Sequence, residues 1–222
     1  MGVDRPIYLL SPTRRSGVHH LPMIRFETIS QDIDFSGYDG LILTSKQGVK
    51  ALDEVSEGAW RALPAAAIGE MTAAEISARG AEVLYVASKA YGDVLAKELA
   101  VRFKGFRWLY PRPKVVVSKI AADLAAAGVS VEEKVIYETV CVDYGSDQRP
   151  KPGAILIFTS PSIVQCFLKS FGWDDTWRAV AIGKKSAQAF EKDIPVCMSD
   201  SPSIDDAIEM ARFLATGKEK GV

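Results

Sequence analysis

The stretch AILIFTSPSIVQCFL, residues 154–168, decides how the rest of the chain is interpreted. It opens with a short apolar, partly β-branched run, Ile155–Phe158, which suits a strand buried on both faces of a parallel sheet. Ser160 suits a helix N-cap, and Pro161 suits the first helical position, where no N–H is needed. An apolar series at helical spacing follows, from Ile163 to Phe171. The residues between the two runs are therefore predicted to form a strand-to-helix turn, where open α/β sheets bind ligands.

The same construction occurs once more, in YDGLILTSKQGVKAL at 38–52, where an apolar run ends in Thr44 and Ser45. Each copy is followed by a second matched motif. AIG at 67–69 leads into EMTA, and AIG at 181–183 leads into KKSA. Two landmarks in the same order at nearly the same spacing indicate two copies of one α/β unit, each with ligand-binding turns at its strand ends.

Strand and helix patterns alternate along the whole chain. This alternation predicts an α/β protein with two doubly wound parallel-sheet lobes. The expected strands are 7–10, 38–45, 65–68, 83–86, 106–110, 131–142, 154–158 and 179–182, and the expected helices include 91–103, 116–127 and 204–214.

Composition limits the functional classes. The 222 residues are 48% hydrophobic and 25% charged, with a net charge of −1. No basic excess suggests a nucleic-acid partner, and no run of apolar residues is long enough to span a membrane. The cysteines, Cys141, Cys166 and Cys197, show no metal or disulfide spacing, which favours a reducing compartment. We therefore expect a soluble cytoplasmic protein. A monomer whose partner is a small molecule is a separate expectation, which composition does not establish.

Cations and hydroxyls follow the predicted strands. The cations are Arg14 and Arg15, Lys46 and Lys50, Arg112 and Lys114, and Lys184 and Lys185. Lysine is common in solvated loops, but together these residues suggest a site for a polyanion. The hydroxyls suit helix caps, which are compatible with carboxylate binding at the same helix ends. The predicted substrate-binding residues are Arg14, Thr44, Ser45, Lys46, Gly69, Thr72, Arg112, Thr159, Ser160, Ser162, Gly183, Lys185 and Ser186.

Other sites find little support. Gly183–Ser186 lacks the spacing of a P-loop, and no dinucleotide fingerprint occurs. His19 and His20 lack a third metal ligand at a useful spacing, so a solvated loop is expected there and no metal site is predicted. Tyr137 is the one plausible catalytic acid, although a tyrosine in a strand usually belongs to the core.

Several motifs together resemble those of the uroporphyrinogen-III synthase family. They are FTSPS followed by AIG-x-x-[ST]-A, the echo LTSKQG and AIGEMTA, LYPR near the middle, and VIYET. The resemblance implies one lobe from 1–28 with 142–222, a second from 34–136, and extended linkers at 29–33 and 137–141. It also implies an enzyme that dehydrates and cyclises hydroxymethylbilane, a linear tetrapyrrole polycarboxylate, with inversion of the fourth pyrrole ring and without a cofactor. The alternative is a non-catalytic cytoplasmic two-lobe protein that binds or senses a small molecule.

Overall fold

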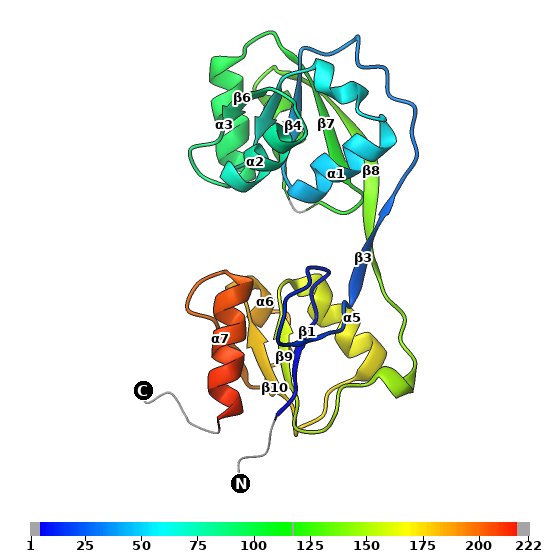
Figure 1. Cartoon of the computed structure of the whole chain (residues 1–222). Coiled ribbons are helices and arrows are strands. Elements are labelled where there is room, and N and C mark those ends of the chain that lie inside the picture. The colour runs from blue at the N-terminus through cyan, green and yellow to red at the C-terminus, as the bar shows by residue number, and fades with distance from the viewer. Residues whose placement is uncertain (1–4, 117, 217–222) are drawn as a thin grey trace. The chain divides into compact units, whose positions relative to one another are not determined.

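The computed structural model describes residues 5–116 and 118–216 and divides the chain into two units (Figure 1). Unit 1 holds the residues up to Arg25 and those from Val140 onward, and unit 2 is Phe26–Thr139. Each unit contains a parallel sheet with α-helices beside it, which confirms the predicted fold class. The chain passes from one unit to the other within β3 (Ile24–Thr28) and again within β8 (Ser130–Cys141).

These two strands are neighbours in the sheet order. The amide of Ile29 donates to the carbonyl of Ile136 (2.8 Å), and the amide of Val142 donates to that of Met23 (2.9 Å). Residue 23 is bonded to residue 142 and residue 29 to residue 136, so β3 and β8 are antiparallel. Of the expected linkers, 137–141 is the end of β8, whereas 29–33 follows β3.

Unit 1 is built on a five-stranded sheet in the order β11-β10-β9-β1-β2, and every pairing in it is parallel. Its first strand pairs with β9 from Ile7↔Ile155 to Leu9↔Ile157, so the start of the chain completes a sheet of C-terminal residues. The elements are β1 (Ile7–Leu9), β2 (His19–His20), η2 (Ser146–Gln148), β9 (Ile155–Phe158), α5 (Pro161–Phe171), β10 (Arg178–Ala181), α6 (Lys184–Ala187), β11 (Val196–Met198) and α7 (Ile204–Ala215).

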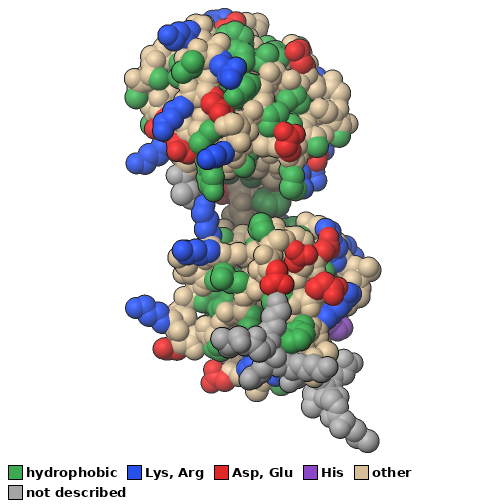
Figure 2. Space-filling model, turned by 90° about the vertical axis from the view of Figure 1, so that its left-hand side faces the viewer, with side chains coloured by type: hydrophobic (Ala, Val, Ile, Leu, Met, Phe, Trp, Pro, Cys, Tyr) green, Lys and Arg blue, Asp and Glu red, His purple; other side chains and the backbone are tan. Residues whose placement is uncertain are grey.

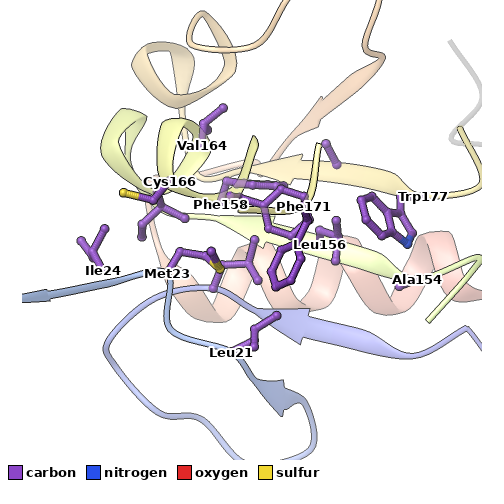
Figure 3. Close-up of a cluster of buried hydrophobic side chains, with 14 residues drawn as sticks. Leu21, Met23, Ile24, Ala154, Leu156, Phe158, Val164, Cys166, Phe171 and Trp177 are labelled. Carbon is purple, nitrogen blue, oxygen red and sulfur yellow. The ribbon is translucent and has the colours of Figure 1, made fainter. Parts of the chain in front are cut away.

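Helices cover both faces of this sheet. Leu156 and Phe158 belong to a core cluster with α5, shown in Figure 3, whereas Ile155 and Ile157 belong to one with α7. Successive strand residues point to opposite faces, so a strand covered on both sides has no polar positions. This arrangement explains the continuous apolar run.

Acidic side chains gather on the face of unit 1 that carries α7 (Figure 2).

Unit 2 is built on a six-stranded sheet in the order β3-β8-β7-β4-β5-β6. The five strands from β8 to β6 are parallel. Leu41 and Leu43 face a cluster with α1 and α2, and Ile42 faces one with α3 and α4. The remaining elements are β4 (Gly40–Leu43), α1 (Lys46–Val55), η1 (Ala59–Ala62), β5 (Ala65–Ala67), α2 (Glu70–Ala78), β6 (Val83–Val86), α3 (Gly92–Arg102), β7 (Arg107–Pro113) and α4 (Ile120–Ala126).

Strand β7 is longer than the strand predicted over 106–110. It was expected to stop before Pro111, but it continues to Pro113, so Arg112 lies within a strand and not in the turn that follows it. The register with β4 reaches only Leu109, whereas the pairing with β8 runs to the end of the strand. Proline is tolerated there because the ladder is paired on one side only.

Two further expectations were wrong. His19 and His20 form the edge strand β2 and not a solvated loop, because His19 stacks on Tyr8 with ring centroids 4.8 Å apart and the pair extends the sheet from β1. The helix expected over 116–127 begins only at Ile120, although it ends near the predicted residue.

Cys141 at the end of β8 and Cys166 on α5 form a disulfide, with Cα atoms 5.4 Å apart. No disulfide was expected from the sequence, because 25 positions separate the two residues and only the fold brings them together. The structure leaves Cys197 as the free thiol. Alkylation of the unfolded, unreduced protein should therefore label one cysteine, as read by mass spectrometry. Labelling of all three would contradict the pairing.

Candidate functional site

The predicted turns lie at the carboxyl edge of each sheet, because all strands that precede them are parallel. In unit 1 this edge carries Arg14 beyond β1, Thr159 to Ser162 after β9, and Gly183 to Ser186 after β10. In unit 2 it carries Thr44 to Lys46 after β4 and Gly69 to Thr72 after β5. The predicted turn residues of each unit therefore lie at the same edge of its sheet, whereas Arg112 lies within β7.

Two of the turns have the same capping geometry. Ser45 and Ser160 are both extended, and each side chain accepts a hydrogen bond from the amide three residues later. The amide of Gly48 lies 2.9 Å from Ser45 Oγ, and that of Ile163 lies 3.3 Å from Ser160 Oγ. These bonds confirm both predicted caps. The other amides of each first turn have no carbonyl within the helix and can donate to an anion.

The AIG turns are built differently. Gly69 and Gly183 precede α2 and α6 with extended backbones and make no side-chain cap. Thr72 is 5% exposed and Ser186 is 3% exposed, so both hydroxyls lie in the interior behind their turns. Any ligand here would meet backbone amides of the first turn rather than these two side chains.

Tyr137 lies in a small polar group at the edge of unit 2. Its hydroxyl is 3.0 Å from Ser45 Oγ, and the hydroxyl of Tyr110 on β7 is 3.5 Å from Thr44 Oγ1. The Tyr137 ring is 4% exposed and meets the ring of Phe26 edge to face. The phenols of Tyr110 on β7 and Tyr137 on β8 therefore lie beside the hydroxyls of the turn after β4.

Burial raises the pKa of the Tyr137 phenol. The hydrogen bond with Ser45 opposes this shift, and the nearby Tyr110 adds to it. Burial likewise raises the pKa of the Tyr110 phenol. Both phenols are therefore protonated at neutral pH, so each carries the proton that a general acid has to supply.

The predicted cations divide into two kinds. Arg14, Lys46 and Lys185 are exposed at the turns. Arg112, in contrast, has its Nε 2.6 Å from Glu133 Oε1, and Lys114 has its Nζ 2.8 Å from Glu138 Oε2. The hydrogen bond and charge of Glu138 raise the pKa of Lys114. The paired cations are positioned by carboxylates, whereas the exposed ones can turn toward a ligand.

Two cavities lie away from these residues. One of about 580 Å³ in unit 1 is lined by residues that include Arg5, His19 and Lys151, and one of about 560 Å³ in unit 2 by residues that include Tyr38 and Glu132. Both occur near the amino ends of strands. The predicted site residues line neither cavity and lie on the open carboxyl edges.

A sequence profile of the family described as "Uroporphyrinogen-III synthase HemD" matches residues 15–209. The chain belongs to the uroporphyrinogen-III synthase family. A search of curated proteins returned no match. The family match covers both units and therefore both groups of turns.

Solved structures agree with this family assignment. Uroporphyrinogen-III synthetase from Helicobacter pylori 26695 is 25% identical, with a TM-score of 0.81 over 95% of this chain and 99% of that one. A mutant uroporphyrinogen III synthase from the extremely thermophilic bacterium Thermus thermophilus is 14% identical, with a TM-score of 0.56 over 97% and 100%. The second likeness shows the fold alone.

In this uroporphyrinogen-III synthase, the sequence did not indicate that Tyr110 lies beside the predicted site residues Thr44 and Tyr137. The residue lies in LYPR, which contributed to the resemblance, but it was expected only as the last residue of a strand. Parallel pairing of β7 with both β4 and β8 places it beside Thr44 and near Tyr137. A strand order, which the sequence does not supply, would have been needed to find it.

Removal of the Ser160 cap in this uroporphyrinogen-III synthase is expected to lower stability slightly and to leave activity in place. Ser160→Ala removes the bond to the Ile163 amide and should lower the free energy of unfolding by about 1 kcal/mol. Activity should remain, because the substitution leaves the backbone amides in the first turn of α5 unchanged. Urea denaturation and a turnover assay check both points, with Gln165→Ala at an exposed position of the same helix as control. A Ser160→Ala enzyme without activity would show that the hydroxyl itself is required.

The part of the chain described here has no helix long and apolar enough to cross a membrane. The same residues contain no group of three His, Cys, Asp or Glu that could hold a metal ion.

Proposed function

We propose that this chain dehydrates and cyclises hydroxymethylbilane with inversion of the fourth pyrrole ring, as a cofactor-independent lyase of haem biosynthesis. The observation that carries the proposal is the family match over residues 15–209, together with the likeness to the Helicobacter pylori enzyme over nearly the whole of both chains. Both favour an enzyme of this type over a non-catalytic binding protein.

The substrate is a flexible polycarboxylate, so binding has to hold several anions at once. First-turn amides after Ser45, Gly69 and Ser160 provide anion-binding ends of the helices α1, α2 and α5, and the short turn after Gly183 adds backbone amides in unit 1. Exposed cations such as Lys46 add attraction without fixing geometry. Positioning of the reacting ends supplies most of the rate enhancement in this proposal.

Tyr137 supplies the acid. Its phenol donates a proton to the substrate hydroxyl, the C–O bond breaks, and water leaves. The resulting carbocation is stabilised by the adjacent pyrrole nitrogen. The substituted carbon of the terminal pyrrole attacks it, and rearrangement through a spiro intermediate inverts that ring. The proton lost when the ring regains aromaticity restores the phenol, so one water is released overall.

Turnover of hydroxymethylbilane tests the function directly. Purified protein should convert it to uroporphyrinogen III faster than the spontaneous reaction, with the inverted isomer identified chromatographically after oxidation. Binding of the substrate without conversion would support the alternative of a sensor and reject the enzyme.

A cytoplasmic location and a monomeric state remain predictions. The disulfide between Cys141 and Cys166 removes the cysteines as an argument for a reducing compartment.

A further inference from the structure

Three exposed apolar side chains lie on the segments that follow parallel strands at the carboxyl edge of unit 2. Met71 is 66% exposed, Tyr91 is 63% exposed and Val115 is 82% exposed. Single apolar residues on a surface are ordinary. These three differ, because each follows the carboxyl end of a different parallel strand: β5, β6 and β7 in turn. We call Met71, Tyr91 and Val115 the apolar rim.

The segments that carry the apolar rim touch one another. A Cβ placed on Gly69, two residues before Met71, would lie 3.3 Å from the Cβ of Ala90. A Cβ placed on Gly92 would lie 2.0 Å from Ser118 Oγ, in the segment between β7 and α4. The start of α2, the start of α3 and the segment after β7 therefore pack side by side, with Tyr91 in the middle.

Cations are interleaved with this apolar surface. Lys89 precedes Tyr91 by two residues, Lys114 is next to Val115, and both are exposed. Glu70 and Asp93 lie in the first turns of α2 and α3, so the surface is mixed in sign, although Lys114 is held by Glu138. Figure 2 shows hydrophobic side chains and Lys or Arg side chains intermingled on unit 2.

We propose that the apolar rim binds pyrrole rings of the linear tetrapyrrole, with Tyr91 as the ring-stacking contact. The inference rests on the proposed function. A pyrrole is a flat, electron-rich ring that carries carboxylate arms, so it needs an apolar face for the ring beside donors for the arms. Helix amides and lysines serve the carboxylates but leave the rings in water. An aromatic side chain offers a ring face at low conformational cost.

The apolar rim matches this occupant better than a second copy of the chain. Stable protein interfaces bury about 800 Å² per partner, and three side chains cover much less. The rim also shares an edge with the predicted anion-binding turns after β4 and β5 and with Tyr137, so a substrate held there lies on the reacting side of the sheet.

The test compares Tyr91→Ala with two matched variants. Tyr91→Phe keeps the ring, and Val101→Ala removes another exposed apolar side chain, 73% exposed, from the same helix α3. Tyr91→Ala should raise KM for hydroxymethylbilane about tenfold with little change in kcat, because ring contact acts on ground state and transition state alike. Tyr91→Phe and Val101→Ala should match the wild type. Thermal melts should be the same for all four proteins, since Tyr91 is exposed.

Each outcome has a separate meaning. A wild-type protein that fails to convert hydroxymethylbilane overturns the proposed function and the inference with it. An active wild type whose KM is unchanged in Tyr91→Ala overturns the inference alone. A concentration-dependent mass by sedimentation that Tyr91→Ala abolishes would identify the rim as a self-association surface and also overturn it. A KM increase in Tyr91→Ala that Tyr91→Phe lacks supports stacking.

Discussion

Tyr137→Phe is expected to slow the dehydration of hydroxymethylbilane by about tenfold or more while substrate affinity is kept. A positioned general acid typically contributes a factor of about 10² to 10⁴. The expected loss starts below this range, because the departing hydroxyl is already activated by the pyrrole nitrogen. The measurement is kcat and KM for the variant beside the wild type, with the product isomer identified.

The structure adds a stability cost to this variant. In the sequence repeat, Phe26 occupies the position in the first half that Tyr137 occupies in the second. This equivalence suggests that the Tyr137 hydroxyl is not needed for the fold. The hydroxyl is however 3.0 Å from Ser45 Oγ, and Ser45 caps α1. Its removal should therefore cost about 1 kcal/mol of unfolding free energy without unfolding unit 2.

The pH dependence follows from the raised pKa of Tyr137. An unperturbed phenol titrates near pH 10, and burial moves this group higher. The acid form is therefore fully present at neutral pH, and its loss lowers the rate only above about pH 10. Stability should change in the same direction: the contribution from burying the neutral phenol is complete below the unfolded pKa and is lost as the pH rises through the folded pKa.

Tyr110→Phe provides the matched control. It deletes the same atom from a phenol that is equally buried, on the neighbouring strand, with its own hydroxyl partner Thr44. If Tyr137 is the acid, Tyr110→Phe should retain near wild-type kcat. An unchanged kcat in Tyr137→Phe would remove the phenol from the mechanism and leave positioning as the whole of catalysis. Equal losses in both variants would indicate a shared structural role.

The parts of the structure that the sequence predicts depend on neighbours along the chain. Ser160 and Pro161 predict the start of a helix, because a capping side chain and the amide that it accepts from lie only three residues apart. The apolar run before them predicts a strand that is covered on both faces. The order of these local signals, repeated at Thr44 and Ser45, was enough to predict the lobes' parallel sheets and the turns at their edges.

What the sequence did not predict depends on contacts between distant segments. Cys141 and Cys166 meet only because the end of β8 packs beside α5. The last residues of β7 remain in a strand despite two prolines, because β8 pairs with them and β4 does not. The association of Tyr110 with Thr44 likewise needs the strand order. Each case requires knowledge of which strands are neighbours.

The second large effect is a loss of stability, expected when the last residue of either duplicated strand is replaced by alanine. Phe158 directly precedes Thr159 and Ser160, and Leu43 directly precedes Thr44 and Ser45; both side chains are fully buried. Phe158 contacts the rings of Phe167 and Phe190 in unit 1, whereas Leu43 belongs to a core cluster of unit 2. Among the described residues, no core cluster draws on both units.

Phe158→Ala should therefore lower the stability of unit 1 by roughly 3–5 kcal/mol, and Leu43→Ala that of unit 2 by roughly 2–5 kcal/mol, through lost burial and the cavity left behind. Peptide-resolved hydrogen exchange separates the two effects, because each variant should lose protection only in its own unit. Each variant is the control for the other at the equivalent position of the repeat. Equal loss of protection in both units from either change would show that they unfold together as one cooperative structure, in spite of their separate cores.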